Sequence, residues 1–192
     1  MDGCAPMSRV RRIFVVTLAA LLPCGGAAVE SFTLSSPDLK PGQTIPEAQV
    51  YRGYGCQGGN RSPALRWSHA PQGTRGFAVT MYDPDAPTGH GWWHWLVVDL
   101  PAQTAELPAG AGDASGRGLP PGSRQLRNDF GERAYGGPCP PKGDKPHRYV
   151  FTVHALKSAR LSVPDDASPA ELEAQLERES LAQASITAYY GR

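Results

Sequence analysis

Two separated stretches of the sequence place imidazole, carboxylate and aromatic groups beside apolar runs. The side chains concerned are Asp83, Asp85, Trp92, His94, His147 and Tyr149. A carboxylate beside a histidine selects one imidazole tautomer or favours the charged ring. Imidazole and phenol donors together suit a phosphate or another small anion. If the two stretches converge in the fold, they form a small polar pocket above apolar strands.

The first stretch, residues 82–95, lies between two apolar runs and holds both aspartates. Pro84 separates Asp83 from Asp85 and keeps the chain extended there. Residues i and i+2 of an extended segment point the same way, so we expect both carboxylates on one side.

The same alternation applies to the end of this stretch. Trp92 and His94 are two residues apart and are expected to face a cleft. Trp93 and Trp95 are expected to face the opposite side, toward the core.

Three functional classes compete on the residues alone. A metal site could use Asp83, Asp85, His94 and His147, but no His-x-His or His-x₃-His spacing accompanies them. Hydrolysis would need an activated nucleophile, and no Gly-x-Ser-x-Gly signal is present. An anion-binding pocket is slightly favoured, although Asp83 could simply cap its own turn and His94 could be a core histidine.

Alternating and apolar runs predict a mainly β protein with many loops. Glycine and proline are abundant, at 22 and 19 residues, and show no repeat period. The predicted strands cover residues 31–36, 48–54, 64–67, 76–82, 92–100 and 147–156. The strand at 92–100 is the most apolar and is expected to be covered on both faces. Residues 185–190 could form a strand or a helix end, and residues 101–122 are expected to form a long surface loop.

The second polar stretch begins the strand at 147–156. His147, Tyr149, Phe151 and Val153 share one face of it, with the polar pair at the mouth of the pocket.

One helix has a clear start. Ser168 is a good N-cap, Pro169 suits the first helical position, and Glu171 completes a capping box. Leu172 and Leu176 then lie on one face of this helix, which we expect to be buried.

The N-terminus has the pattern of a secretory signal peptide. Basic residues precede an apolar run of residues 13–22, and small residues follow up to Ala28. We therefore expect a signal peptide at 1–28, a single domain at 29–192, and export to the periplasm or the medium. A lipoprotein anchored at Cys24 is an alternative that Pro23 disfavours. The whole chain has a net charge of +1, so nothing suggests a nucleic-acid partner, and the apolar run is too short to span a membrane comfortably.

Cys56 and Cys139 are the cysteines that remain after removal of Cys4 and Cys24 with the signal peptide. An even pair in an exported chain predicts a Cys56–Cys139 disulfide. The alternative is two unrelated buried thiols.

Three motifs in order resemble the phosphatidylethanolamine-binding protein family, in its bacterial Raf-kinase-inhibitor-like branch. They are Asn60-Arg61-Ser62-Pro63-Ala64-Leu65-Arg66-Trp67, the run Tyr82 to Pro87 with Trp92-Trp93-His94-Trp95, and Gly137-Pro138-Cys139-Pro140-Pro141-Lys142-Gly143 with His147-Arg148-Tyr149. The resemblance implies a Greek-key antiparallel β-sandwich with a few peripheral helices and a small anion pocket. It places the pocket residues at Asp83, Trp92, His94, Pro140, His147 and Tyr149, with Asp85 close by.

Two positions depart from the family's eukaryotic members. Trp93 stands where those often carry a second histidine, and Cys139 stands where the pocket rim often has glycine. Kinase inhibition would not suit an exported protein.

We therefore expect a non-enzymatic protein that binds a small anionic or phosphorylated ligand without a metal or cofactor. In that role His94, His147 and Tyr149 would donate hydrogen bonds, and Asp83 would orient an imidazole. The alternative is an inhibitor or adaptor that contacts a protein partner through the pocket rim and the 101–122 loop.

Overall fold

A computed structural model describes Met1 and residues 30–192 of the chain. The predicted signal peptide at 1–28 lies outside the described residues, apart from Met1. The elements in chain order are β1 (Thr33–Ser35), β2 (Arg52–Gly53), β3 (Cys56–Gln57), β4 (Leu65–Ser68), β5 (Gly76–Asp83), β6 (Trp92–Pro101), β7 (Glu106–Leu107), β8 (Arg124–Gln125), β9 (His147–Leu156), α1 (Pro169–Glu179) and β10 (Ser180–Tyr190). The strands at 31–36, 64–67, 76–82, 92–100 and 147–156 are confirmed to within a few residues.

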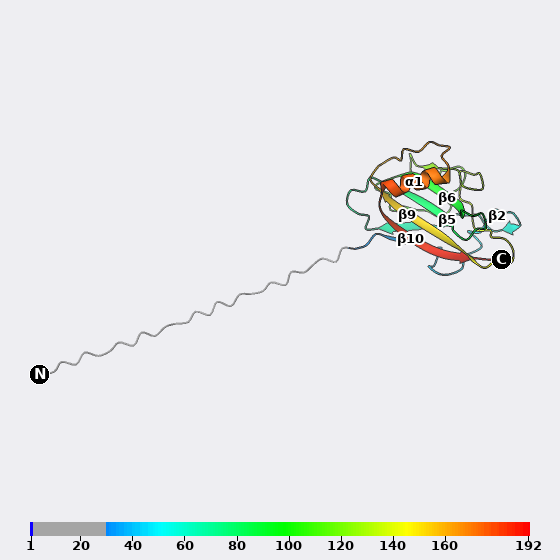
Figure 1. The fold of residues 1–192 in the computed structure, drawn as a ribbon, viewed down its shortest axis with the longest axis horizontal. Coiled ribbons are helices and arrows are strands. Elements are labelled where there is room, and N and C mark those ends of the chain that lie inside the picture. The colour runs from blue at the N-terminus through cyan, green and yellow to red at the C-terminus, as the bar shows by residue number, and fades with distance from the viewer. Residues whose placement is uncertain (2–29) are drawn as a thin grey trace.

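The strands form antiparallel sheets that share a core (Figure 1). The larger sheet has the order β10-β9-β5-β6-β8, and the second sheet has the order β1-β4-β7. Trp67 of β4 packs on Phe77 of β5 with ring centroids 5.5 Å apart, which joins the two sheets face to face. The predicted mainly β, single-domain sandwich is therefore confirmed.

The strands β5 and β6 of the larger sheet are buried on both faces. Phe77, Val79 and Met81 of β5 belong to the core between the sheets, whereas Ala78 belongs to a second apolar cluster on the other face. Helix α1 covers this second face by burying Leu172 and Leu176 (Figure 1). The two-sided burial explains why β5 and β6 have nearly continuous apolar sequences.

Helix α1 begins as the capping-box pattern predicts. The Ser168 side chain accepts a hydrogen bond from the backbone amide of Glu171, and the Glu171 side chain accepts from the backbone amide of Ser168. Within residues 30–192 this is the only α-helix, whereas the resemblance implied a few.

A β-bulge in β6 separates the tryptophans that were expected to share a face. Met81 pairs with Trp95 and Tyr82 pairs with Trp93, so His94 is an extra residue in β6. Trp93 consequently packs against the cluster under α1, whereas Trp95 lies in the core between the sheets. The prediction of one common face was wrong, because a bulge interrupts the alternation that it assumed.

Two further local predictions were wrong. Residues 48–54 do not form one strand: only Arg52–Gly53 does, paired with β3 as a short hairpin. The 101–122 segment is only partly a surface loop, because β7 pairs with β4 and both Leu107 and Ala111 are buried. The open question at 185–190 is settled as strand, since β10 pairs with β9 along its whole length.

Within residues 30–192 the structure contains no helix with the length and hydrophobicity that crossing a membrane requires.

Candidate ligand-binding site

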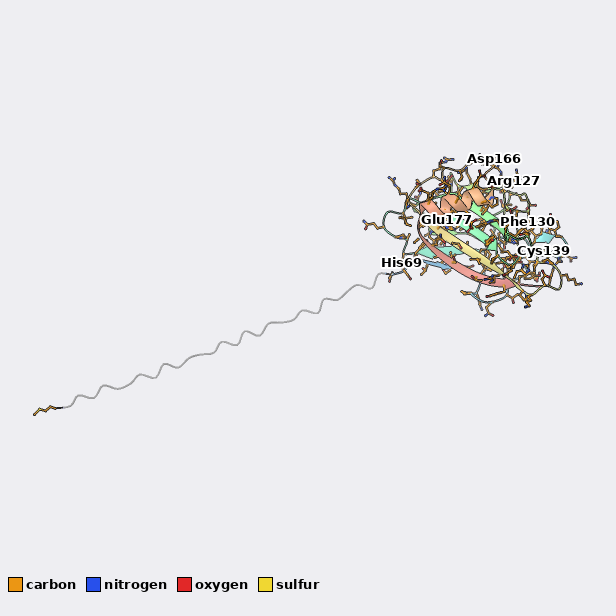
Figure 2. The ribbon with its side chains drawn as sticks, in the orientation of Figure 1. His69, Arg127, Phe130, Cys139, Asp166 and Glu177 are labelled. Carbon is orange, nitrogen blue, oxygen red and sulfur yellow. A yellow bond between two sulfur atoms is a disulfide. The ribbon has the colours of Figure 1, made fainter. Side chains whose placement is uncertain are left out.

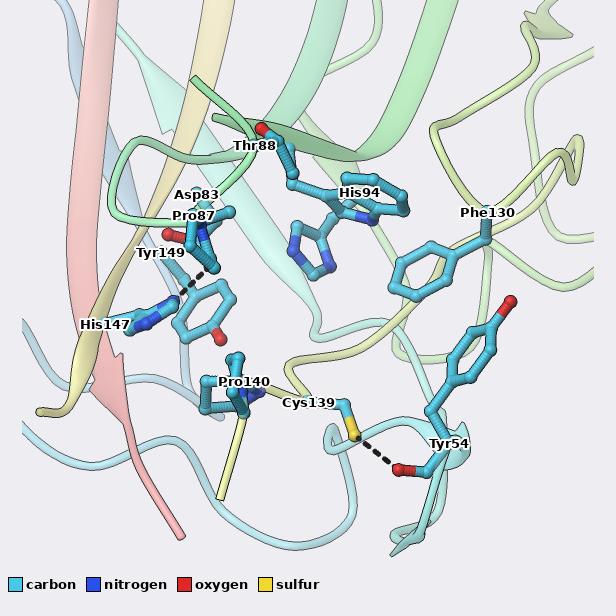
Figure 3. Close-up of a pocket in the computed structure, with 13 residues that line it drawn as sticks. Tyr54, Asp83, Pro87, Thr88, His94, Phe130, Cys139, Pro140, His147 and Tyr149 are labelled. Atoms are coloured by element: carbon cyan, nitrogen blue, oxygen red, sulfur yellow. Dashed lines mark hydrogen bonds and ion pairs between the residues drawn. The ribbon is translucent and has the colours of Figure 1, made fainter. Parts of the chain in front are cut away.

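One cavity opens at the end of the sandwich where β5 ends and where β6 and β9 begin. It encloses about 400 Å³. Its walls are formed by Tyr54, Asp83, Ala86, Pro87, Thr88, Trp92, His94, Phe130, Cys139, Pro140, Pro141, His147 and Tyr149 (Figure 3). Segments far apart in the sequence meet here because antiparallel pairing of β5 with both β6 and β9 brings these strand ends together.

Six of the seven predicted site residues line this cavity, and the seventh does not. The six are Asp83, Trp92, His94, Pro140, His147 and Tyr149. Asp85 does not line this cavity, so the structure does not bring it together with the other six. Two aromatic residues that the sequence reasoning missed, Tyr54 and Phe130, also line it. Figure 2 shows Phe130 and Cys139 at the same end of the molecule, beside β2 and far from His69.

Asp83 and His147 form a buried pair at one side of the cavity. His147 Nδ1 donates to Asp83 Oδ2 at 2.8 Å, and both side chains are at least nine-tenths buried. The other carboxylate oxygen of Asp83 accepts from the backbone amide of Asp85 at 2.8 Å. The second imidazole nitrogen, His147 Nε2, lies 3.5 Å from Asp144 Oδ2. Asp83 thus fixes both the tautomer and the orientation of His147.

His94 is held differently, by a backbone carbonyl. Its Nδ1–H donates to the carbonyl oxygen of Gly136 at 2.8 Å, and the residue is 3% exposed. Burial lowers the pKa of His94 to about 4, although the Gly136 carbonyl and the Asp83 carboxylate act in the opposite direction. The ring is therefore neutral near pH 7. Its Nδ1–H is directed at the backbone, so it is not a free donor for a ligand.

Two donors of the cavity wall have no partner within the described residues. The Tyr149 hydroxyl and the Trp92 Nε1–H are both buried and unpaired. Burial first, then the charge of the nearby Asp83 carboxylate and a side-chain hydrogen-bond contribution from it, raise the pKa of Tyr149, so the hydroxyl keeps its proton. The Asp83 carboxylate lies near the hydroxyl, but the geometry between them is too poor for a hydrogen bond. In Figure 3 this hydroxyl points toward Pro140. Buried donors normally have a partner, so this pair indicates a place for a ligand or water.

An aromatic shelf of Tyr54, Tyr51, Phe130 and Trp92 continues from the cavity to the surface. Phe130 is its centre, stacked on Tyr51 at 4.4 Å and edge-on to Trp92 at 5.4 Å between ring centroids. Tyr54 stacks on Tyr51 at 5.8 Å and is 74% exposed, which places the outer end of the shelf in solvent. Figure 3 shows Phe130 and Tyr54 on the side of the cavity opposite His147.

A disulfide and an arginine are among the links that hold the rim of the cavity. The predicted disulfide is confirmed, because Cys56 and Cys139 are bonded across 83 residues of sequence. Arg192 adds a second link: its Nε donates to the Pro140 carbonyl at 2.7 Å and its Nη2 to the Tyr54 carbonyl at 3.2 Å. The Tyr54 loop and the Cys139–Pro140 loop are therefore joined both covalently and through a guanidinium.

Asp85 braces the loop from outside the cavity. It accepts three hydrogen bonds from Arg148, namely from its backbone amide, Nε and Nη2, at 2.6–2.9 Å. These bonds hold the pKa of the Asp85 carboxyl down, at about 2. Asp83 and Asp85 consequently have different partners. The expectation that both carboxylates lie on one side of an extended segment at Pro84 was wrong.

The Arg148–Asp85 contact gives a testable pH effect. Because the folded pKa of Asp85 is depressed, its contribution to stability is fully present above the ordinary value near 4 and is lost as pH falls through about 2. We expect Arg148→Ala to return the Asp85 pKa toward its ordinary value. A carboxyl-carbon NMR titration of both proteins measures this, and an unchanged Asp85 pKa in the variant would contradict the assignment.

The described residues form no group of three or more His, Cys, Asp or Glu side chains that could hold a metal ion. The described lining residues include no lysine or arginine. The site therefore offers neutral donors, one neutral imidazole and the Asp83–His147 pair. This set can bind a small polar anion by hydrogen bonds rather than through an arginine or lysine.

Three comparisons with known proteins agree with this architecture. A sequence model described as phosphatidylethanolamine-binding protein matches residues 35–191. The UPF0098 protein YbcL of Escherichia coli K12 is 46% identical over 181 residues, covering 94% of this chain and 98% of that protein. The UPF0098 protein YbhB of the same strain is 50% identical over 157 residues, covering 82% and 98% respectively.

Solved structures give the same result. The crystal structure of E. coli YbcL, described as a new member of the mammalian PEBP family, superposes with a TM-score of 0.82 at 50% identity, covering 84% of this chain and 98% of that one. A phosphatidylethanolamine-binding protein homologue from Chlamydia trachomatis gives a TM-score of 0.70 at 28% identity, with the same coverage. These matches confirm both the resemblance and the fold expected from the sequence.

Proposed function

Because this chain belongs to the phosphatidylethanolamine-binding protein family, we propose that it binds a small anionic or phosphorylated ligand in the cavity between β5, β6 and β9. The observation that carries this proposal is the pair of buried, unpaired donors, Tyr149 O–H and Trp92 Nε1–H. An oxyanion that enters the cavity would accept from both. Each buried donor without a partner costs about 1–3 kcal/mol, so a ligand or water that satisfies them is favoured.

We further propose that the protein binds its ligand without transforming it. The hydroxyl groups of the described cavity wall belong to Tyr54, Thr88 and Tyr149, and none of them is hydrogen-bonded to a histidine. Thr88 donates to the carbonyl of Gly91 instead. Nucleophilic catalysis requires a hydroxyl or thiol within hydrogen-bond reach of its base, and the described wall supplies no such pair.

Export to the periplasm or the medium is the third part of the proposal. It is supported by the signal-peptide pattern of residues 1–28 and by the Cys56–Cys139 bond, since disulfides persist mainly in oxidising compartments. Fractionation of cells that express the full chain tests it. Recovery of an uncleaved chain in the cytosol would contradict it.

No contact within residues 30–192 favours the alternative role as an inhibitor or adaptor. The 101–122 segment proposed for a protein partner is anchored to β4 through β7 and contributes Leu107 and Ala111 to the core.

Phosphate is expected to raise the melting temperature, and His94→Ala is expected to abolish that rise. A ligand at a hundred times its Kd adds about 2.7 kcal/mol to the free energy of unfolding. For a domain of this size that corresponds to a shift of about 5–10 °C. The variant removes a wall of the cavity and the ring that packs edge-on against Tyr149 at 5.2 Å. Differential scanning calorimetry with increasing phosphate measures the shift.

His90→Ala is the matched control for this experiment. His90 lies in the same β5–β6 connection, is exposed, and does not line the cavity. The His90 variant should keep the full phosphate shift. A shift that persists undiminished in the His94 variant would refute the site.

A further inference from the structure

A backbone carbonyl next to His94 determines which nitrogen of the imidazole donates and which accepts a hydrogen bond. A carbonyl oxygen cannot donate, so the 2.8 Å contact with Gly136 requires the hydrogen of His94 to be on Nδ1. In a neutral imidazole the other nitrogen, Nε2, then carries only a lone pair. His94 therefore presents an acceptor to the cavity that it lines.

The groups around His94 keep the ring neutral at physiological pH. Burial lowers the pKa of His94 to about 4. Of the charged and titratable groups packed around it, Asp83 on β5 favours the protonated ring, His147 on β9 disfavours it, and Tyr149 on β9 keeps its own proton.

The other polar groups of the wall have complementary roles. Trp92 Nε1 can only donate, and the Tyr149 hydroxyl is unpaired. Each oxygen of Asp83 already accepts one hydrogen bond, from the amide of Asp85 and from His147. The cavity thus offers donors for an anionic oxygen and, at His94 Nε2, an acceptor for a hydrogen.

We propose that the cavity selects oxyanions that carry a hydrogen of their own, such as inorganic phosphate or the monoanion of a phosphomonoester, over those that carry none, such as a phosphodiester or sulfate. This inference rests on the proposed function and names the class of ligand for the same site. The P–OH donates to His94 Nε2 while the charged oxygens accept from Trp92 and Tyr149. An oxyanion that carries no hydrogen (a bare oxyanion) instead turns an oxygen lone pair toward the nitrogen lone pair of His94 Nε2.

The selectivity has a defined size and pH dependence. A buried acceptor that faces a lone pair loses its hydrogen bond, so bare oxyanions are expected to bind at least about tenfold more weakly. A phosphomonoester has its second pKa near 6, so its hydrogen-bearing form becomes about tenfold rarer with each pH unit above that value. Its affinity should fall accordingly above pH 6, with uptake of one proton from the buffer onto the bound phosphate.

Isothermal titration calorimetry of the wild-type chain tests this with four small probes. Inorganic phosphate and methyl phosphate represent free phosphate and phosphomonoesters, dimethyl phosphate represents the diester of a lipid headgroup, and sulfate is a tetrahedral anion without a hydrogen. At pH 7.5 phosphate should bind at least about tenfold more tightly than sulfate and dimethyl phosphate. Titration of methyl phosphate in two buffers of different ionisation enthalpy should show proton uptake approaching one.

The outcomes separate this inference from the proposed function. Equal affinity for all four probes without proton uptake would overturn the inference and leave the anion site intact. If none of the four probes binds, both the inference and the proposed function are overturned. Preference for phosphate with proton uptake supports both.

His94→Gln provides a second, independent readout. The glutamine amide can rotate to donate to a bare oxygen, so the preference for phosphate over sulfate should shrink to a few-fold. His90→Ala should keep the wild-type preference. Full preference retained in a folded His94→Gln chain would show that the selectivity does not come from Nε2 and would overturn the inference.

Discussion

Replacing Asp83 with asparagine is expected to lower the free energy of unfolding by about 3–5 kcal/mol and to abolish the stabilisation by phosphate. The carboxylate is buried and accepts from both His147 Nδ1 and the amide of Asp85. An asparagine can still accept from the amide through Oδ1, but its NH₂ group then faces the Nδ1–H of His147. The imidazole must move its hydrogen to Nε2 or rotate, and either change alters the polar wall of the cavity.

Asp85→Asn is the matched control for that experiment. It is the same chemical change two residues along the chain, but Asp85 is partly exposed and lies outside the cavity. Ion pairs near the surface contribute little to stability, so this variant should lose much less stability and keep its response to phosphate. Denaturant unfolding of both variants with and without phosphate makes the comparison. Equal losses in the two variants would contradict a special role for the Asp83–His147 pair.

The part of the site that could be predicted from the sequence follows regular strand geometry. His147, Tyr149, Phe151 and Val153 alternate in β9, and all four line the cavity or the core between the sheets. Asp83 continues the alternation of β5 and is the last residue of that strand. Period-two patterning was sufficient for these residues because the strands are unbroken there.

The part that could not be predicted depends on departures from that geometry. His94 lines the cavity as predicted, but it is a bulge residue, and the bulge turns Trp93 and Trp95 to opposite faces of the sheet. A bulge is created by pairing with β5, which the local sequence does not display. Asp85 was assigned to the pocket because it is two residues from Asp83, but Arg148 on the neighbouring β9 binds it outside. In both cases a tertiary contact decides the direction of a side chain that local spacing had assigned otherwise.

The aromatic shelf was missed for a different reason. Tyr54 and Phe130 lie in loops, where no periodicity indicates which way a side chain points. A signal was nevertheless present, because Tyr54 is two residues from Cys56 and Cys139 borders the predicted pocket residue Pro140. A predicted Cys56–Cys139 bond therefore already placed the Tyr54 loop at the pocket rim.

That bond is the basis of the second large effect that we expect. Replacing both Cys56 and Cys139 with serine should lower the free energy of unfolding by about 3–5 kcal/mol on the chain-entropy model, because the bond closes a loop of 83 residues. Loss of the bond removes the covalent link of the rim and leaves hydrogen bonds only, from Arg192 to the Pro140 and Tyr54 carbonyls and from the Tyr51 amide to the Pro138 carbonyl. Affinity for phosphate should therefore fall several-fold as well, because the rim must be ordered again on binding.

Reduction of the wild-type chain by dithiothreitol is the control that separates the bond from the substitutions. Reduced wild-type protein should unfold at the same denaturant concentration as the double variant, and the reductant should leave the double variant unchanged. The same logic extends to the compartment in which the protein is made. Chain produced in a reducing cytosol should match the variant until it is oxidised, and chain recovered from an oxidising compartment should not. If oxidised and reduced wild-type proteins unfold alike, the bond does not stabilise the fold, and the expected loss in the double variant is contradicted.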